Sequence, residues 1–181
     1  RGEGCGALLL EKADNSSETC CLQRSWGTIV GSALVQDGHT ANLTSPNGPS
    51  QIAAMQLALR RARLEPSQID YIETHGTGTN LGDPIEVKSI ANVFGERNSA
   101  LYLGAVKTNL GHLETAAGLA SIIKVLLCLQ KKELPPNLHM DKINPLIEPF
   151  VGDFIRFPRN TVKLHGKYAS VSSFGFGGTN G

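Results

Sequence analysis

The sequence lacks an excess of charge of either sign. It holds 17 Lys and Arg residues against 16 Asp and Glu residues, so its formal net charge is +1. A chain this close to neutral has no electrostatic basis for binding nucleic acid or an anionic membrane surface. The sequence also lacks an apolar run long enough to span a bilayer, and it shows no signal-peptide pattern. We therefore expect a soluble protein with neither nucleic acid nor a membrane as a partner.

Cysteine is scarce, and its spacing argues against cysteine-based sites. The four cysteines show no metal-ligand spacing, and adjacent Cys20 and Cys21 would make an awkward disulfide partner set. Reduced thiols in a cytoplasmic protein are the better interpretation. Cys5 stands early in a predicted buried strand, so we interpret it as a small apolar core residue and not as a nucleophile.

Strands and helices alternate along the chain, whose length and 40% hydrophobic content suit one domain with one core. The patterns predict strands over residues 5–12, 26–35, 69–73, 101–106, 154–157 and 168–174. They predict helices over residues 51–63, 83–95 and 115–129. This alternation predicts an α/β fold with a largely parallel sheet covered on both faces. Because residue 1 directly precedes a strand pattern and the chain stops inside a glycine-rich loop, we expect a fragment.

Two of these helices carry further signals. Asp83-Pro84-Ile85-Glu86 places an acceptor at the N-cap, proline at the first helical position and glutamate three residues after the cap. We therefore interpret Asp83 and Glu86 as structural caps. The helix over 115–129 is apolar nearly all round, which predicts a buried core helix and not a membrane span.

Two histidines lie in glycine-rich turns, each placed after a predicted strand. His75 lies in Tyr-Ile-Glu-Thr-His-Gly-Thr-Gly-Thr (71–79), and His112 lies in Lys-Thr-Asn-Leu-Gly-His-Leu-Glu (107–114). In an α/β fold, loops at the carboxyl ends of strands present reactive side chains. Two neutral imidazoles brought together there can donate hydrogen bonds to a developing oxyanion or transfer protons near neutral pH. The pair therefore indicates a catalytic site.

The residues of these turns also have structural interpretations. His75 can close a turn, with its ring satisfied by a backbone carbonyl. Thr77 and Thr79 can be turn-forming residues. Lys107 can extend its stem to solvent, and Glu114 can be a favourable charge at a helix N-terminus.

Two other kinds of site are less well supported. A zinc site would need a third ligand beside His75 and His112, and no residue has convincing spacing. The remaining histidines lie in loops without a supporting pattern and are expected at the surface; they are His39, His139 and His165. A phosphate site is conceivable, but His-Gly-Thr-Gly-Thr is neither a Walker nor a dinucleotide pattern, and no lysine follows in register.

Three ordered motifs resemble those of the β-ketoacyl synthases. Residues 71–86 resemble the first histidine motif of that family, residues 107–118 its second, and residues 173–180 its C-terminal glycine-rich loop. The form Gly-His-Leu-Glu and the segment 45–51 resemble the type I polyketide synthases, whereas animal fatty acid synthase is less similar at the second motif. The resemblance implies a thiolase-like layered α/β fold. Residues 1–181 would be its C-terminal half, with a mainly parallel mixed sheet flanked by helices.

The resemblance also implies a decarboxylative Claisen condensation. In that family a cysteine takes the growing acyl chain from a carrier protein, a malonyl-type extender loses carbon dioxide, and its carbanion attacks the thioester. By this resemblance, His75 and His112 stabilise the enolate, and Lys107 organises His112. Glu114 has a supporting role, and Thr77 and Thr79 bind the pantetheine arm. The amide of Phe176 forms half of an oxyanion hole, and its ring gates the acyl pocket.

Partners follow from the same resemblance. The substrates would be carried on the phosphopantetheine of an acyl carrier protein, and the synthase would bind no cofactor of its own. An acyltransferase and other domains would belong to the same megasynthase, and the full-length ketosynthase would form a homodimer.

The sequence departs from the family in one respect. The nucleophilic cysteine of that family lies in an upstream motif, and none of the four cysteines has such a context. We therefore expect a parent enzyme of the 3-oxoacyl synthase (acyltransferase) type and an inactive isolated fragment. Two alternatives are a non-catalytic, chain-length-factor-like condensing domain and a thiolase-fold acyltransferase without decarboxylation. Intact His75, Lys107 and His112 argue against the first, because a scaffold has no need of them.

Overall fold

A four-stranded parallel sheet lies at the centre of this computed structural model, which describes residues 1–12, 25–38, 46–152 and 154–181. The strand order is β5-β3-β2-β7, and each neighbouring pair is parallel. The strands are β2 (Ile69–Glu73), β3 (Leu101–Gly104), β5 (Ile155–Arg156) and β7 (Tyr168–Val171). The strand predicted over 69–73 is confirmed in full, and the other three are confirmed with shorter bounds.

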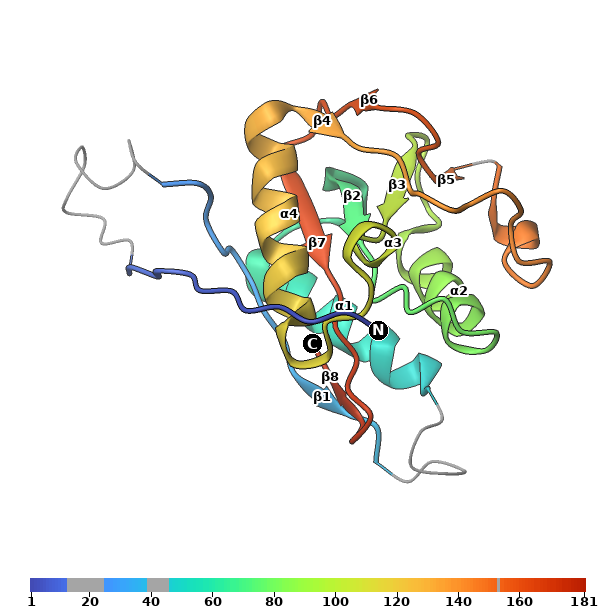
Figure 1. The fold of residues 1–181 in the computed structure, drawn as a ribbon, viewed down its shortest axis with the longest axis horizontal. Helices are drawn as coiled ribbons and strands as arrows, with labels where there is room; N and C mark the ends of the chain where they lie inside the picture. Colours follow the sequence, from blue (N-terminus) through green and yellow to red (C-terminus); the bar gives the residue numbers. More distant parts are fainter. Residues whose placement is uncertain (13–24, 39–45, 153) are drawn as a thin grey trace.

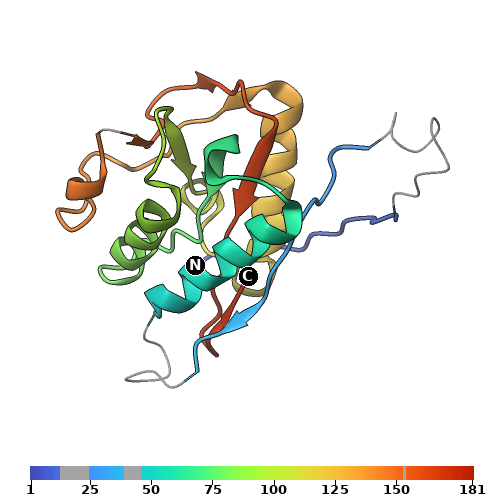
Figure 2. The same ribbon diagram turned by 180° about the vertical axis from the view of Figure 1, so that it is seen from behind.

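Helices cover both faces of the sheet, as predicted (Figures 1 and 2). The three longest are α1 (Gly48–Ala62), α2 (Gly82–Phe94) and α4 (Ala117–Lys131). Side chains of α1 and α2 form one buried cluster with Ile72 and Leu103 of the sheet. On the opposite face, Val125 and Cys128 of α4 pack with Tyr71. The central strand β2 therefore contributes to both cores, which fixes its position tightly.

The sequence around Asn47 explains where α1 begins. The Asn47 side chain accepts a hydrogen bond of 3.3 Å from the Ser50 amide, and Pro49 occupies the first turn. Such a cap stabilises a helix by about 1 kcal/mol. The helix therefore begins at Gly48, a few residues before the predicted start, and the first residue after it, Arg63, adopts a left-handed conformation.

The two predicted N-terminal strands do not form over the described residues. Residues 1–12 hold no strand, and of the predicted strand at 26–35 only its last residue is part of β1 (Val35–Gln36), which pairs antiparallel with β8 (Thr179–Asn180). Cys5 is exposed, so its interpretation as a core residue is wrong. An apolar run becomes a buried strand only where a neighbouring strand pairs with it, and Leu9 is instead 99% exposed.

Short elements complete the fold. They are η2 (Pro66–Gln68), α3 (Lys107–Leu110), η3 (Glu114–Ala116), β4 (Glu133–Leu134), η4 (Glu148–Phe150) and β6 (Val162–Lys163). Strands β4 and β6 pair antiparallel. Among the described helices none is long and apolar enough to cross a bilayer. Helix α4 packs into the core through Val125 and Cys128, as a core helix would, but among the described residues its burial is confined to one face and Leu127 is exposed.

Candidate active site

The first histidine turn leaves the sheet at the carboxyl end of β2. There the Thr74 amide and its hydroxyl both donate to the Gly104 carbonyl, at 2.8 and 2.9 Å. This double contact joins the ends of β2 and β3 directly before His75. The next residue, Gly76, has a φ of 47°, a left-handed conformation that glycine adopts without strain.

Glu86 holds the backbone of this turn. Its buried carboxylate accepts hydrogen bonds from the amides of His75 and Gly76, at 2.7 and 2.9 Å. Burial raises the pKa of Glu86 to about 7, although the two backbone hydrogen bonds oppose that shift. The carboxyl group therefore lies close to half-ionised at neutral pH.

The predicted capping box is accordingly wrong. The helix starts at Gly82, and its N-cap residue is Leu81, whose side chain makes no capping hydrogen bond. Asp83 accepts from the Gly78 amide at 3.1 Å, so both acidic groups bind the histidine turn and not the helix terminus. A capping box and a carboxylate aimed at a preceding loop give the same sequence pattern.

The second histidine turn follows β3. Contrary to the sequence prediction, β3 ends at Gly104, and Lys107 opens the short helix α3 instead of ending a strand. His112 therefore comes after a helical turn, where Gly111 has a φ of 75°.

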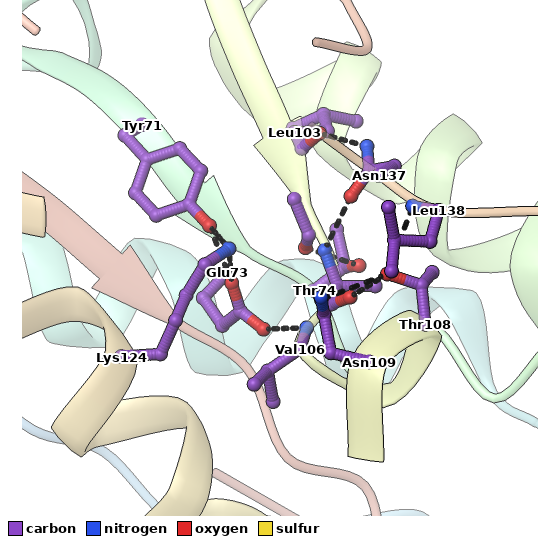
Figure 3. Close-up of polar contacts among 12 residues, drawn as sticks. Tyr71, Glu73, Thr74, Leu103, Val106, Thr108, Asn109, Lys124, Asn137 and Leu138 are labelled. Atoms are coloured by element: carbon purple, nitrogen blue, oxygen red, sulfur yellow. Dashed lines mark hydrogen bonds and ion pairs between the residues drawn. The ribbon is translucent and has the colours of Figure 1, made fainter. Parts of the chain in front are cut away.

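Asn137 fixes the start of this second turn, as Figure 3 shows. Its side-chain amide donates to the Leu103 carbonyl at 3.0 Å, and its oxygen accepts from the Ala105 amide at 2.9 Å. The Thr108 hydroxyl donates to the Ala105 carbonyl at 2.8 Å and accepts from Leu138. The sequence analysis missed Asn137, whose only signal is its place after Pro135-Pro136.

The two imidazoles lie side by side. Their ring centroids are 5.6 Å apart and their planes are at 89°, which confirms the prediction that His75 and His112 converge. The Phe174 ring also lies 5.6 Å from His75, at 60°. The sequence analysis included Phe174 in the glycine-rich loop but gave it no role.

The surroundings favour neutral rings. Burial lowers the pKa of His75 to about 3, and the charge on Lys107 acts in the same direction. Burial and Lys107 also lower the pKa of His112, against the opposing effect of Glu114. The His75 Nδ1 atom is buried and has no hydrogen-bond partner among the described residues.

The tautomer of His112 follows from a backbone contact. The Glu114 amide donates to His112 Nδ1 at 3.1 Å, so Nδ1 is the acceptor and the neutral ring carries its proton on Nε2. Glu114 adopts a φ of 53°, unusual for a residue other than glycine, and its exposed carboxylate pairs with Arg1 at 3.0 Å. Glu114 thus contacts His112 through its backbone.

Lys107 is the cation of the site. It is half-buried, and burial lowers its pKa while the carboxyl groups of Glu86, Glu73 and Asp83 oppose that shift. Because Lys107 lowers the pKa of both histidines, the site combines two neutral rings with one neighbouring ammonium group.

The other predicted site residues lie near the surface. The hydroxyls of Thr77 and Thr79 are 3.4 Å apart, and Thr79 accepts from the Gly82 amide at 3.1 Å. Phe176 is 75% exposed. The roles of these three residues stay predictions. Within the described ranges, no three His, Cys, Asp or Glu residues gather closely enough to hold a metal ion.

Sequence relatives of the chain include polyketide synthases. Residues 26–141 match the family described as "Beta-ketoacyl synthase, C-terminal domain". The chain is 42% identical over 187 residues to a phenolphthiocerol/phthiocerol polyketide synthase of Mycobacterium bovis, across 99% of this chain and 10% of that protein. It is 42% identical to a highly reducing polyketide synthase of Penicillium rubens, across 100% of this chain and 8% of the relative. The chain thus spans about a tenth of the length of these curated relatives.

Solved ketosynthases share the fold. An oxazolomycin ketosynthase domain from Streptomyces albus matches 87% of this chain and 29% of its own with a TM-score of 0.81 and 35% identity. The ketosynthase from module 6 of the bacillaene synthase of Bacillus subtilis 168 matches 86% and 29%, with a TM-score of 0.80 and 37% identity. The expected thiolase-like α/β fold is confirmed by these neighbours. The chain belongs to the β-ketoacyl synthase family and is similar to the ketosynthases of polyketide synthases.

Proposed function

We propose that this chain forms the C-terminal part of a ketosynthase that catalyses decarboxylative Claisen condensation in polyketide or fatty acid assembly. The observation that carries the proposal is the pair of neutral imidazoles, 5.6 Å apart, beside Lys107. Membership of the β-ketoacyl synthase family supports it. The complete synthase would provide the cysteine that holds the acyl chain as a thioester.

The chemistry asks for two neutral donors. When a malonyl thioester decarboxylates, its bond to the carboxylate carbon breaks, carbon dioxide leaves, and the electron pair passes into an enolate. Imidazole N–H groups of His75 and His112 donate to the enolate oxygen, and a donor of this kind is worth about 3 kcal/mol. The α-carbon then attacks the acyl thioester, a carbon–carbon bond forms, and the cysteine thiolate leaves.

The other predicted residues would assist this reaction. Burial keeps the pKa of both rings low, Lys107 adds to this by charge repulsion, and the Glu114 amide orients His112. Thr77 and Thr79, adjacent to the His75 turn, would bind the pantetheine arm. The Phe176 amide would contribute half of the oxyanion hole, and its exposed ring would gate the acyl pocket.

The partners are part of the same proposal. The substrates would arrive on the phosphopantetheine of an acyl carrier protein, with no further cofactor bound to the ketosynthase. The acyltransferase and other domains of one megasynthase would act with it, and the complete ketosynthase would be a homodimer in the cytoplasm. The relatives' names support this setting, since they are polyketide synthases about ten times the length of this chain.

The complete protein tests the proposal. The His112→Ala variant is expected to release carbon dioxide from a malonyl thioester about 100-fold more slowly, because one enolate donor is lost, while acyl loading stays within about threefold. Lys107→Ala acts in the same direction through His112. The matched control is His165→Ala, since His165 is exposed in a loop outside the site. Equal loss of loading and carbon dioxide release, measured separately with radiolabelled substrates, contradicts the assigned roles.

A further inference from the structure

A buried ion pair lies directly behind the histidine turns. Glu73, the last residue of β2, is fully buried, and its Oε2 lies 2.6 Å from the ammonium group of Lys124, whose side chain is 13% exposed. The Tyr71 hydroxyl donates to the same Oε2 and accepts from Lys124. The second oxygen, Oε1, accepts from the Val106 amide at 2.5 Å. Figure 3 shows these groups around one carboxylate.

This carboxylate connects β2, the residue before Lys107, and helix α4. Glu73 ends β2 two positions before His75, and Val106 directly precedes Lys107. Lys124 lies in α4, the helix that begins soon after His112. The Glu73 carboxylate therefore joins the strand before His75 to Val106, which precedes Lys107, and to Lys124 in the helix that follows His112.

Stability alone is a weak reason for such a pair. Two charges removed from water lose hydration, and a buried pair of this kind is often matched or exceeded in stability by apolar side chains of similar volume. What apolar side chains cannot supply is direction. The Glu73 carboxylate fixes the positions of three donors: the Tyr71 hydroxyl, the Val106 amide and the Lys124 ammonium group. Burial raises the pKa of Tyr71, so its hydroxyl stays neutral and serves both neighbours.

We propose that the Glu73–Lys124 ion pair positions the two catalytic histidines relative to each other. This rests on the proposed function, in which both rings donate to one enolate oxygen. Within the described part of the chain, no hydrogen bond or ion pair joins Glu73 or Lys124 to either imidazole ring, so both act as positioning residues. A displacement of about 1 Å between catalytic groups can lower a rate about 100-fold, which is the scale on which this pair matters.

Two variants of the complete protein test the proposal. Glu73→Gln keeps an acceptor for Val106 but loses the ion pair, and Lys124→Met removes the ammonium group. For both, kcat for malonyl decarboxylation is expected to fall about 10- to 100-fold, with KM within about twofold, because the groups move while the substrate contacts remain. In crystal structures of the variants, the ring centroids are expected to depart by about 1 Å from 5.6 Å.

The matched control lies at the other end of the same strand. Asp70, near the start of β2, pairs with the buried Arg97 at 3.4 Å, away from both histidines. Asp70→Asn therefore lowers the melting temperature without changing kcat. The separate variant Lys124→Arg keeps the positive charge, and its kcat is expected to stay within about threefold of the wild-type value. If the two main variants fail to fold, Glu73→Asp, which keeps the charge but draws the carboxylate back by one methylene from Lys124 and Val106, is expected to lower kcat about threefold or more.

The outcomes separate this proposal from the proposed function. If Glu73→Gln and Lys124→Met fold and leave both the ring separation and kcat unchanged, the positioning role is overturned. It is also overturned if Asp70→Asn lowers kcat as much as these two variants do. For variants that do not fold, unchanged kcat in Glu73→Asp has the same meaning. A wild-type protein that does not decarboxylate malonyl thioesters overturns the proposed function instead, and the ring separation in the variants still decides the positioning role.

Discussion

At His75, burial and a neighbouring cation act in the same direction on one imidazole. Burial is the larger cause, and Lys107 and then His112 add to it, so the pKa falls from 6.5 to about 3. A ring with this pKa stays neutral across the whole range in which enzymes usually work. A neutral ring can donate a hydrogen bond through one nitrogen and accept one through the other without first losing a proton.

The first prediction concerns this titration. In the folded protein, the His75 imidazole is expected to show no change of charge between about pH 5 and pH 8, because its pKa lies below that range. Lys107→Met should raise the pKa of His75, yet leave it below 6.5, since burial remains. NMR titration of the side-chain signals, assigned with His75→Ala, measures both. A His75 midpoint near 6.5 in the wild type contradicts the prediction.

The second prediction concerns Glu86, whose pKa rises on folding from 4.5 to about 7. The folded state binds this proton more tightly, so the stabilisation is complete below pH 4.5 and is lost as pH rises through about 7. Glu86→Gln removes this dependence. Its destabilisation relative to wild type should therefore shrink between pH 5 and pH 8, by about 2 kcal/mol. Denaturant unfolding at both pH values measures it, with exposed Glu133→Gln as the control. A difference independent of pH contradicts the raised pKa.

At the scale of elements, the sequence predicts what depends on local periodicity. The strand at 69–73 and the three long helices could be placed because apolar side chains recur at strand or helix spacing. Periodicity could not decide whether residues 5–12 and 26–35 form strands, because a strand also needs a partner strand to pair with. Their apolar content resembles that of a buried strand whether or not a partner is present.

The site also has residues that the sequence could predict and residues that it could not. His75, Lys107 and His112 could be predicted because glycine-rich turns follow predicted strands. Glu73 and Lys124 are 51 positions apart, and no sequence pattern relates them. Phe174 and Phe176 look alike in the sequence, yet one ring packs on His75 and the other is exposed. Contacts between segments, and the directions of single side chains, are properties of the folded chain.

The third prediction tests how the end of β3 is held. Asn137→Ala removes the acceptor of the Ala105 amide and the donor to the Leu103 carbonyl, so two part-buried backbone hydrogen bonds are lost. The expected loss in the free energy of unfolding is about 1–3 kcal/mol. Thermal or denaturant unfolding measures it. Asn98→Ala is the control, because Asn98 is exposed. Equal stability of the two variants contradicts a structural role for Asn137.

At the scale of the molecule, the two ends of the described chain differ in how they are packed. From residue 46 onward the helices and sheet enclose two cores. Of the described segments before it, residues 1–12 and the start of 25–38 lie beside α4, and the rest of 25–38 lies against α1 and ends in β1 (Figures 1 and 2). These segments expose large apolar side chains: Leu9, Leu10, Trp26, Ile29, Val30 and Leu34. Large apolar side chains left exposed in this number usually mark a contact with another part of a protein.

The last prediction follows from that surface. The isolated 181-residue chain is expected neither to condense substrates, since it lacks the family's cysteine motif, nor to behave as a well-folded monomer. Exposed apolar area disfavours the monomer by about 25 cal/mol per Å², and self-association covers it. Light scattering of the expressed chain should show oligomers, and a dye that fluoresces on apolar surfaces should bind. Leu34→Ser with Trp26→Ser should reduce both signals, whereas Ser25→Ala, a neighbouring exposed position, should not. A monomer that unfolds cooperatively and binds no dye would show that these residues suffice for an independent fold.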